Sequence, residues 1–219
     1  MIKYYNKITW SISEINSSAT MLVHALSGCN LHCAGCFNYD LLVASKHDAF
    51  FTMKDVCKAV SSMAELAEYV VISGGEYLLS PIEELVYDLT LLRETTTLPI
   101  IVYTNGTNPE KLQYLFENNL ISGAHTDLKL PFYELEQFTD ADIIYDTVGK
   151  KLTSEEIDNI RTSIISTVQY DMGLNQIRSV KYPWIDSSVF EENSQYISTL
   201  NKRFNKNTPY IVNNFIVPQ

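Results

Sequence analysis

The chain has 219 residues, of which 46% are hydrophobic and 19% are charged, and its formal net charge is −10. This composition is typical of a folded globular protein and excludes a disordered or fibrous chain. The acidic balance argues against nucleic-acid binding, because neutralising phosphates needs many Lys and Arg residues. Residues 1–16 lack the apolar core of a secretory signal, and no run of about 18 apolar residues occurs, so we expect a cytoplasmic protein without a membrane span.

The first predicted strand, at residues 20–26, leads directly into a loop that contains three cysteines. A helix then begins after Thr52, a typical N-cap residue. Its apolar positions predict one buried face, formed by Val56, Cys57, Val60, Met63 and Leu66. The second strand, at residues 69–74, ends in Gly-Gly-Glu, and the next helix starts at Pro81.

The third strand is predicted at residues 98–106 and ends in Thr-Asn-Gly; a helix at residues 108–119 follows it. The fourth strand, at residues 124–130, contains Asp-Leu-Lys, and residues 131–151 are expected to be looser. The capping-box pair Thr153 and Glu156 opens an amphipathic helix that Gly173 closes. The remaining predicted elements are a strand at residues 175–183, a short helix at 187–202 and a strand at 209–217.

Six strands that alternate with helices predict an α/β fold with a mainly parallel sheet, arranged as a partial (β/α)6 barrel. We expect an N-terminal extension at residues 1–19 and a single barrel domain at residues 20–219. In such sheets, ligands bind at the carboxyl ends of the strands. The cysteine loop, Gly-Gly-Glu, Thr-Asn-Gly and Asp-Leu-Lys all follow strands, so they are predicted to meet at one rim.

Cys29, Cys33 and Cys36 lie close together in a chain that has only one other cysteine, Cys57. In the cytoplasm such a cluster indicates metal binding more often than disulfides. A structural zinc site needs a fourth ligand, for which Cys57, His24 and His32 are the candidates. The apolar helix face around Cys57 favours a core role for it instead. The alternative is a [4Fe-4S] cluster held by three thiolates, whose fourth iron is open to a substrate.

The sequence CNLHCAGC, with its C-x3-C-x2-C spacing, resembles the motif of the radical S-adenosylmethionine (SAM) enzymes. From about Leu22 onward the chain is most similar to the activating proteins of glycyl radical enzymes, and among these to the activating protein of anaerobic ribonucleoside-triphosphate reductase. The later Gly-Gly-Glu, Thr-Asn-Gly and Asp-Leu-Lys motifs add to this resemblance, which makes the expected fold a partial barrel of the radical SAM type.

The resemblance implies that the three cysteines ligate a [4Fe-4S] cluster whose open iron binds SAM, and that reduction of this cluster yields a 5′-deoxyadenosyl radical. The cysteines are therefore the predicted catalytic and metal-binding residues. The other predicted cofactor-binding residues are Phe37, Asn38, Gly74, Gly75, Glu76, Thr104, Asn105, Asp127, Lys129 and Arg178. The resemblance places the Gly-Gly-Glu motif at the amino group of SAM, with glycines that permit close backbone approach. Asp127 and Lys129 share one face of a strand.

Three positions depart from the family pattern. Gly35 stands where many radical SAM proteins have an aromatic residue before the third cysteine. Tyr103 stands where the activating enzymes tend to have an Asp that helps to bind a monovalent cation, and Tyr77 replaces the usual Pro after Gly-Gly-Glu. Adenine stacking and a cation site are therefore less firmly implied than the cluster.

The first functional hypothesis is an enzyme that installs a glycyl radical on a protein partner, the large subunit of anaerobic ribonucleotide reductase. By resemblance, a flavodoxin or ferredoxin would supply the electron. The first alternative keeps the radical chemistry but acts on a small heterocycle, as the 7-carboxy-7-deazaguanine synthases do. The second alternative is a metal-stabilised binding module without turnover. Neither a nucleic acid nor a membrane is an expected partner.

Overall fold

The computed structural model describes residues 1–12, 15 and 17–217, which form two compact units. The first unit comprises Met1–Asn30, Asn38–Tyr103 and Tyr114–Gly123. The second comprises Leu31–Phe37, Thr104–Gln113 and Ala124–Gln219. Residues 13, 14 and 16 of the predicted N-terminal extension and residues 218–219 of the predicted barrel domain lie outside the described residues.

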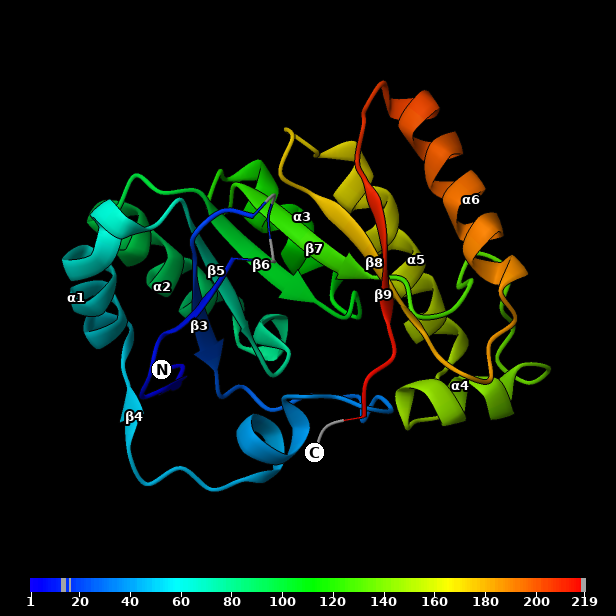
Figure 1. Cartoon of the computed structure of the whole chain (residues 1–219), viewed down its shortest axis with the longest axis horizontal. Coiled ribbons are helices and arrows are strands. Elements are labelled where there is room, and N and C mark those ends of the chain that lie inside the picture. The colour runs from blue at the N-terminus through cyan, green and yellow to red at the C-terminus, as the bar shows by residue number, and fades with distance from the viewer. Residues whose placement is uncertain (13–14, 16, 218–219) are drawn as a thin grey trace. The chain divides into compact units, whose positions relative to one another are not determined.

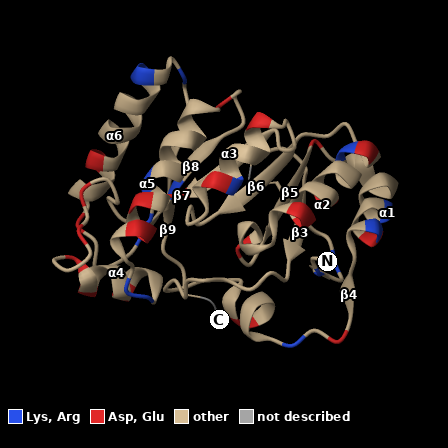
Figure 2. Ribbon diagram, turned by 180° about the vertical axis from the view of Figure 1, so that it is seen from behind, with Lys and Arg blue, Asp and Glu red and all other residues tan. Residues whose placement is uncertain are grey.

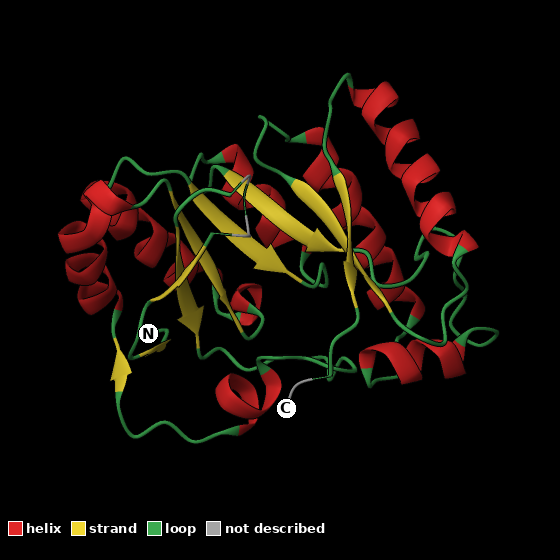
Figure 3. Ribbon diagram, viewed as in Figure 1, coloured by secondary structure: helices red, strands yellow, loops and turns green. Residues whose placement is uncertain are grey.

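The first unit is built on a sheet whose centre is parallel (Figures 1 and 3). Its strands are β1 (Tyr4–Tyr5), β2 (Thr9–Ser11), β3 (Thr20–Ala25), β4 (Phe50–Phe51), β5 (Tyr69–Gly74) and β6 (Ile100–Thr104), which runs into the second unit. They are ordered β4-β1-β3-β5-β6, and β2 pairs with β3. Residues 70–72 and 100–102 are fully buried, as expected of central parallel strands covered on both faces.

Helices of the first unit pack against each other beside this sheet, α1 (Met53–Met63) against α2 (Ile82–Thr95) (Figure 1). Thr52 caps α1 through a capping box with Asp55, which confirms the predicted start. Cys57 is buried with Met53, Val56 and Val60, so its core role is confirmed. Leu66 was wrongly placed on this face, because α1 ends at Met63 and Leu66 lies in a following 3-10 turn, 71% exposed.

The described residues also form three shorter helices, the π-helix Tyr39–Ala44 and the 3-10 helices Ala64–Leu66 and Tyr77–Leu79. The helix α3 (Pro109–Glu117) confirms the predicted helix there, including Pro109 at its start.

The second unit carries three parallel strands in the order β7-β8-β9. They are β7 (Gly123–Asp127), which begins at the last residue of the first unit, β8 (Gln176–Lys181) and β9 (Tyr210–Asn214). Its helices are α4 (Ala141–Val148), α5 (Ser154–Gln169) and α6 (Ser188–Phe204), of which α5 packs on β8 and α6, and α6 on β9. The helix α6 has Glu191 in its first turn and Lys202 and Arg203 in its last, as favoured by the helix dipole. Figure 2 colours acidic residues red and basic residues blue.

The six strands predicted from the sequence all occur, and the α/β class with a mostly parallel sheet is confirmed. The three strands that were not predicted, β1, β2 and β4, have only two or three residues each and pair antiparallel. The prediction of a looser segment at residues 131–151 is wrong in part, because it contains α4. In the described part of the chain, no helix combines the length and the apolar character that crossing a membrane requires.

The helix α5 is shorter than predicted. Its capping box of Thr153 and Glu156 is confirmed, but it ends at Gln169 and does not reach Gly173. The Asp171 carboxylate accepts hydrogen bonds from the amides of Gly173 and Asn175, at 2.8 and 3.0 Å. This turn replaces the last helical residues that the pattern had suggested.

Candidate functional site

In the first unit, the Gly-Gly-Glu turn lies directly against the start of the cysteine loop. The Gly75 amide donates to the Ala25 carbonyl at 3.0 Å, and the Glu76 amide donates to the Gly28 carbonyl at 2.7 Å. A Cβ added to Gly75 would lie 2.1 Å from the Gly28 oxygen, and one added to Gly74 would lie 2.4 Å from the Ala25 oxygen. Both glycines are therefore needed for this close backbone approach.

The side chains of this turn are buried and anchored. Glu76 is 2% exposed, and its Oε1 accepts a hydrogen bond from the Leu78 amide at 3.2 Å. Asn38, one of the predicted cofactor-binding residues, donates from Nδ2 to the Gly74 carbonyl at 2.9 Å. Tyr77 is fully buried, and this burial raises the pKa of its phenol. Substituting Tyr for the usual Pro thus adds a core anchor directly after the motif.

In the second unit, the segment that carries Cys33 and Cys36 is fixed by the end of α4. The His32 amide donates to the Val148 carbonyl at 2.9 Å, and the Ala34 amide donates to the Thr147 carbonyl at 3.0 Å. The Cys36 amide closes a tight turn on the Cys33 carbonyl at 3.2 Å. The helix α4, which the sequence did not reveal, therefore supports the segment Leu31–Phe37.

Asp127 and Lys129 form an ion pair in the second unit, with Nζ and Oδ2 2.7 Å apart. The Lys129 side chain is only 13% exposed. Burial by itself would lower the pKa of Lys129, but the charges of Asp127, Cys33 and Tyr182 outweigh it and raise this pKa well above its ordinary value. Lys129 is thus a cation at any physiological pH and lies within electrostatic range of Cys33.

Tyr182 lies in the same group and was not predicted. It is 3% exposed, and this burial is the main cause that raises the pKa of its phenol to about 12. Cys33 and Asp127 also raise this pKa, whereas the positive charge of Lys129 lowers it. It directly follows the last residue of β8. In the sequence, its position near the end of a predicted strand is the signal that could have marked Tyr182 as a candidate site residue.

Thr104 and Asn105 make hydrogen bonds within the turn that follows β6. The Thr104 hydroxyl accepts from the Gly106 amide at 3.1 Å, and Asn105 Oδ1 accepts from the Thr107 amide at 3.0 Å, so both residues shape the turn after β6. Phe37 is 64% exposed and does not pack in the core. The Arg178 Nε donates to Gln176 Oε1 at 3.0 Å.

Arg178 also influences His125, which is 2% exposed on β7. Burial first, and then the positive charge of Arg178, lower the pKa of His125 well below 6.5, although a hydrogen bond with the Leu174 backbone opposes them. Below pH 6.5 the unfolded chain would take up a proton at this position that the folded chain does not.

We therefore expect the free energy of unfolding to decrease as the pH falls below 6.5, by up to about 1.4 kcal/mol per pH unit from this group. Urea denaturation at several pH values between about 8 and 5.5 would measure this slope. The substitution His125→Gln should make this slope smaller. Burial also lowers the pKa of His24, which therefore contributes to the slope with the same sign in the wild type and in the variant. Equal slopes in the two proteins would contradict this assignment.

Three cysteine thiols are the kind of donor that an iron–sulfur cluster requires. Cys29, Cys33 and Cys36 are partly exposed and none of them is in a disulfide. Cys33 is one of the groups that raise the pKa of Lys129, so its sulfur lies within electrostatic range of the Lys129 ammonium. Cys29 belongs to the first unit and the other two to the second. No group of three Cys, His, Asp or Glu side chains among the residues described forms a metal site, so ligation by the three cysteines stays a prediction.

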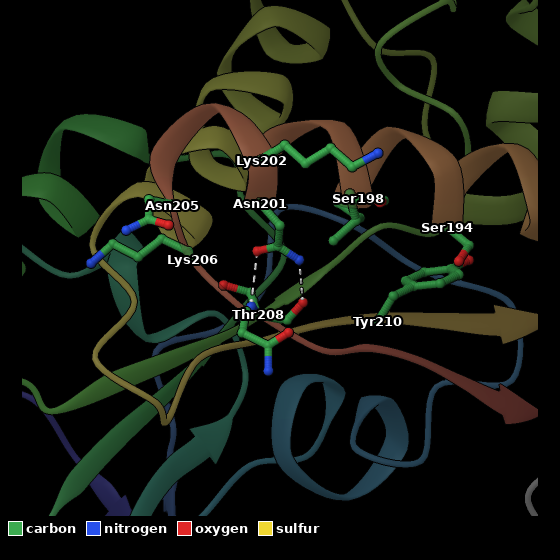
Figure 4. A pocket seen from close by; sticks show the side chains of 10 residues that line it. Ser194, Ser198, Asn201, Lys202, Asn205, Lys206, Thr208 and Tyr210 are labelled. Atoms are coloured by element: carbon green, nitrogen blue, oxygen red, sulfur yellow. Dashed lines mark hydrogen bonds between the residues drawn. The ribbon is translucent and has the colours of Figure 1, made fainter.

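A pocket of about 500 Å3 elsewhere in the second unit lies between α6 and the residues leading into β9 (Figure 4). Asn201 spans it by donating from Nδ2 to the Thr208 carbonyl and accepting from the Thr208 amide, both at 2.9 Å. None of the predicted site residues lines this pocket. It is therefore separate from the residues to which the sequence motifs point.

Comparison with known proteins identifies the family. The family model of the radical SAM superfamily matches residues 24–164. A Methanocaldococcus jannaschii protein, named as a candidate glycyl-radical enzyme activating enzyme, is 29% identical over 113 residues, which cover 52% of this chain and 45% of the relative.

Two solved structures have a similar fold, those of native and polyhistidine-tagged anSMEcpe, both with bound AdoMet. Each gives a TM-score of 0.53 at 18% identity and covers 88% of this chain and 50% of that chain. The chain thus spans about half the length of the proteins it matches. The similarity in fold confirms the predicted partial barrel of the radical SAM type, and since the family model covers more than half of its 219 residues, the chain belongs to the radical SAM superfamily.

Proposed function

We propose that this chain is a radical SAM activase that installs a glycyl radical on a partner protein, the large subunit of an anaerobic ribonucleotide reductase. The observation that carries the chemistry is the environment of Cys33, where the partly exposed Lys129–Asp127 pair and the buried Tyr182 lie within electrostatic range of a cysteine. Membership of the radical SAM superfamily implies a [4Fe-4S] cluster and SAM. The name of the 29% identical relative supports the class of partner.

In this proposal Cys29, Cys33 and Cys36 would hold the cluster, which would pass one electron from an external donor to SAM and so supply its cleavage to methionine and a 5′-deoxyadenosyl radical. The residues of the chain position SAM for that step. The Gly-Gly-Glu turn would receive the amino group of SAM, because its glycines let it pack against the start of the cysteine loop and Glu76 is acidic. Lys129, held by Asp127, offers a cation for the carboxylate of SAM.

The remaining predicted residues, Phe37, Asn38, Thr104, Asn105 and Arg178, would support this binding. Asn38 and Asn105 would act indirectly, since their hydrogen bonds fix the turns on which the contacts depend. The electron would come from a flavodoxin or ferredoxin in the cytoplasm. The hydrogen atom would come from a glycine Cα of the partner, which leaves 5′-deoxyadenosine and a glycyl radical as products.

Anaerobic reconstitution with iron and sulfide tests the proposal. We expect cluster formation, production of 5′-deoxyadenosine from SAM with dithionite, and a glycyl radical doublet in the EPR spectrum when the reductase subunit is added. Cleavage of SAM without the doublet would instead indicate a small-molecule substrate. Uptake of zinc alone, or of no metal, would overturn the enzymatic proposal and support a binding module.

A further inference from the structure

Three aromatic side chains of the second unit form a closed group that we call the aromatic wall, made up of Tyr182, Trp184 and Phe215. Their ring centroids are 5.2 Å apart for Tyr182 and Trp184, 5.4 Å for Tyr182 and Phe215, and 5.7 Å for Trp184 and Phe215. Tyr182 and Trp184 follow β8, whereas Phe215 follows β9. The wall therefore joins the ends of two neighbouring strands.

Phe215 packs directly on the cysteine loop. A Cβ built on Gly35 would lie 2.5 Å from Phe215 Cε2 and 3.4 Å from the Ile216 carbonyl oxygen. Gly35 also has a φ of +66°, a left-handed conformation that glycine adopts without strain. The ring of Phe215 thus occupies the space in which a side chain at position 35 would lie, immediately before Cys36.

The aromatic wall is also tied to the helix that holds the loop. Trp184 Nε1 donates to Thr147 Oγ1 at 3.1 Å, and the Thr147 carbonyl accepts from the Ala34 amide at 3.0 Å. Gly149 approaches the same loop so closely that a Cβ there would lie 2.1 Å from the His32 oxygen. The segment from Leu31 to Phe37 is therefore held by α4 on one side and contacted by Phe215 through Gly35.

We propose that Phe215 is a positioning residue that fixes the Gly35–Cys36 turn and, with Trp184 and Tyr182, excludes water from this side of the cluster. The cluster itself rests on the proposed function, while the packing on Gly35 does not. An apolar shell limits the access of water and chelators to a metal site. Loss of the Phe215 ring should therefore leave the cysteines in place but loosen the turn and expose the cluster.

The first test compares Phe215→Ala with Tyr196→Ala. Tyr196 is a matched control because it stacks on Tyr133, with centroids 4.1 Å apart, and belongs to another aromatic pair of the same unit. After anaerobic reconstitution, a chelator is added and the loss of the visible cluster absorbance is followed. We expect Phe215→Ala to lose its cluster at least about tenfold faster than wild type, Tyr196→Ala to behave as wild type, and Phe215→Tyr to recover most of the protection. Equal rates in all four proteins would overturn the proposal.

The second test needs no cluster and so separates this inference from the proposed function. Amide hydrogen exchange is measured on the same proteins without iron, over residues 31–37. Phe215→Ala should accelerate exchange at Ala34 and Cys36, whose amides bond to Thr147 and Cys33, while Tyr196→Ala should not. If the wild type takes up no iron, the proposed function fails and this exchange still decides the inference. Unchanged exchange in Phe215→Ala would refute it.

Discussion

Replacing any one of Cys29, Cys33 and Cys36 by alanine should prevent assembly of the [4Fe-4S] cluster and abolish the cleavage of SAM. A cluster held by only three thiolates has no spare thiolate in its loop. Loss of even an outer partner of a metal ligand costs about 10- to 100-fold in metal affinity, and the loss of a ligand costs at least as much. Iron and sulfide content after anaerobic reconstitution, together with the yield of 5′-deoxyadenosine, measures both effects.

Cys57→Ala is the matched control for these variants. Cys57 is 7% exposed within the core face of α1, and burial raises the pKa of its thiol, which disfavours the ligating thiolate form. We expect wild-type cluster content with a modest loss of stability. A loss of iron in Cys57→Ala would revive a four-cysteine site. Full cluster content and SAM cleavage in Cys29→Ala would show that the three-cysteine assignment is wrong.

Local sequence signals predicted the elements that carry the motifs. The strand β5 has the predicted bounds, because an unbroken apolar run ends at a glycine pair. Thr52 and Thr153 form capping boxes with the acidic residues three positions later, because a threonine hydroxyl and such a carboxylate can bond each other's backbone amides. The ion pair of Asp127 and Lys129 follows from the alternation of side chains along an extended segment.

Features that depend on contacts between distant segments could not be predicted. The helix α4 has eight residues, too few for a clear periodic pattern, and its role becomes visible only through its bonds to His32 and Ala34. Phe215 carries no motif, and its importance lies entirely in its packing on Gly35. The two aromatic substitutions near the family motifs, Tyr77 and Tyr103, could be noted in the sequence, but the burial of Tyr77 required the fold.

Gly75→Ala should damage both the stability of the first unit and the binding of SAM. The new Cβ would lie 2.1 Å from the Gly28 oxygen, and because both partners are backbone atoms, no flexible side chain can move away. The Gly-Gly-Glu turn must move away from Gly28, which breaks the 2.7 Å hydrogen bond from the Glu76 amide to the Gly28 carbonyl. We expect the free energy of unfolding to fall by about 1–3 kcal/mol. SAM affinity of the reconstituted protein should fall at least about tenfold, since the binding turn is displaced.

Gly173→Ala is the control for Gly75→Ala, because it replaces a glycine that has no close backbone neighbour. Gly173 has a φ of +98°, and a Cβ there would meet no atom within 4 Å. Alanine at this position should cost about 1–2 kcal/mol of stability through backbone strain alone, and SAM affinity should be unchanged. Urea denaturation and equilibrium dialysis with SAM compare the two variants on the same scale. Wild-type SAM affinity in Gly75→Ala would mean that the approach of the turn to Gly28 serves folding only, and that SAM is recognised by other residues.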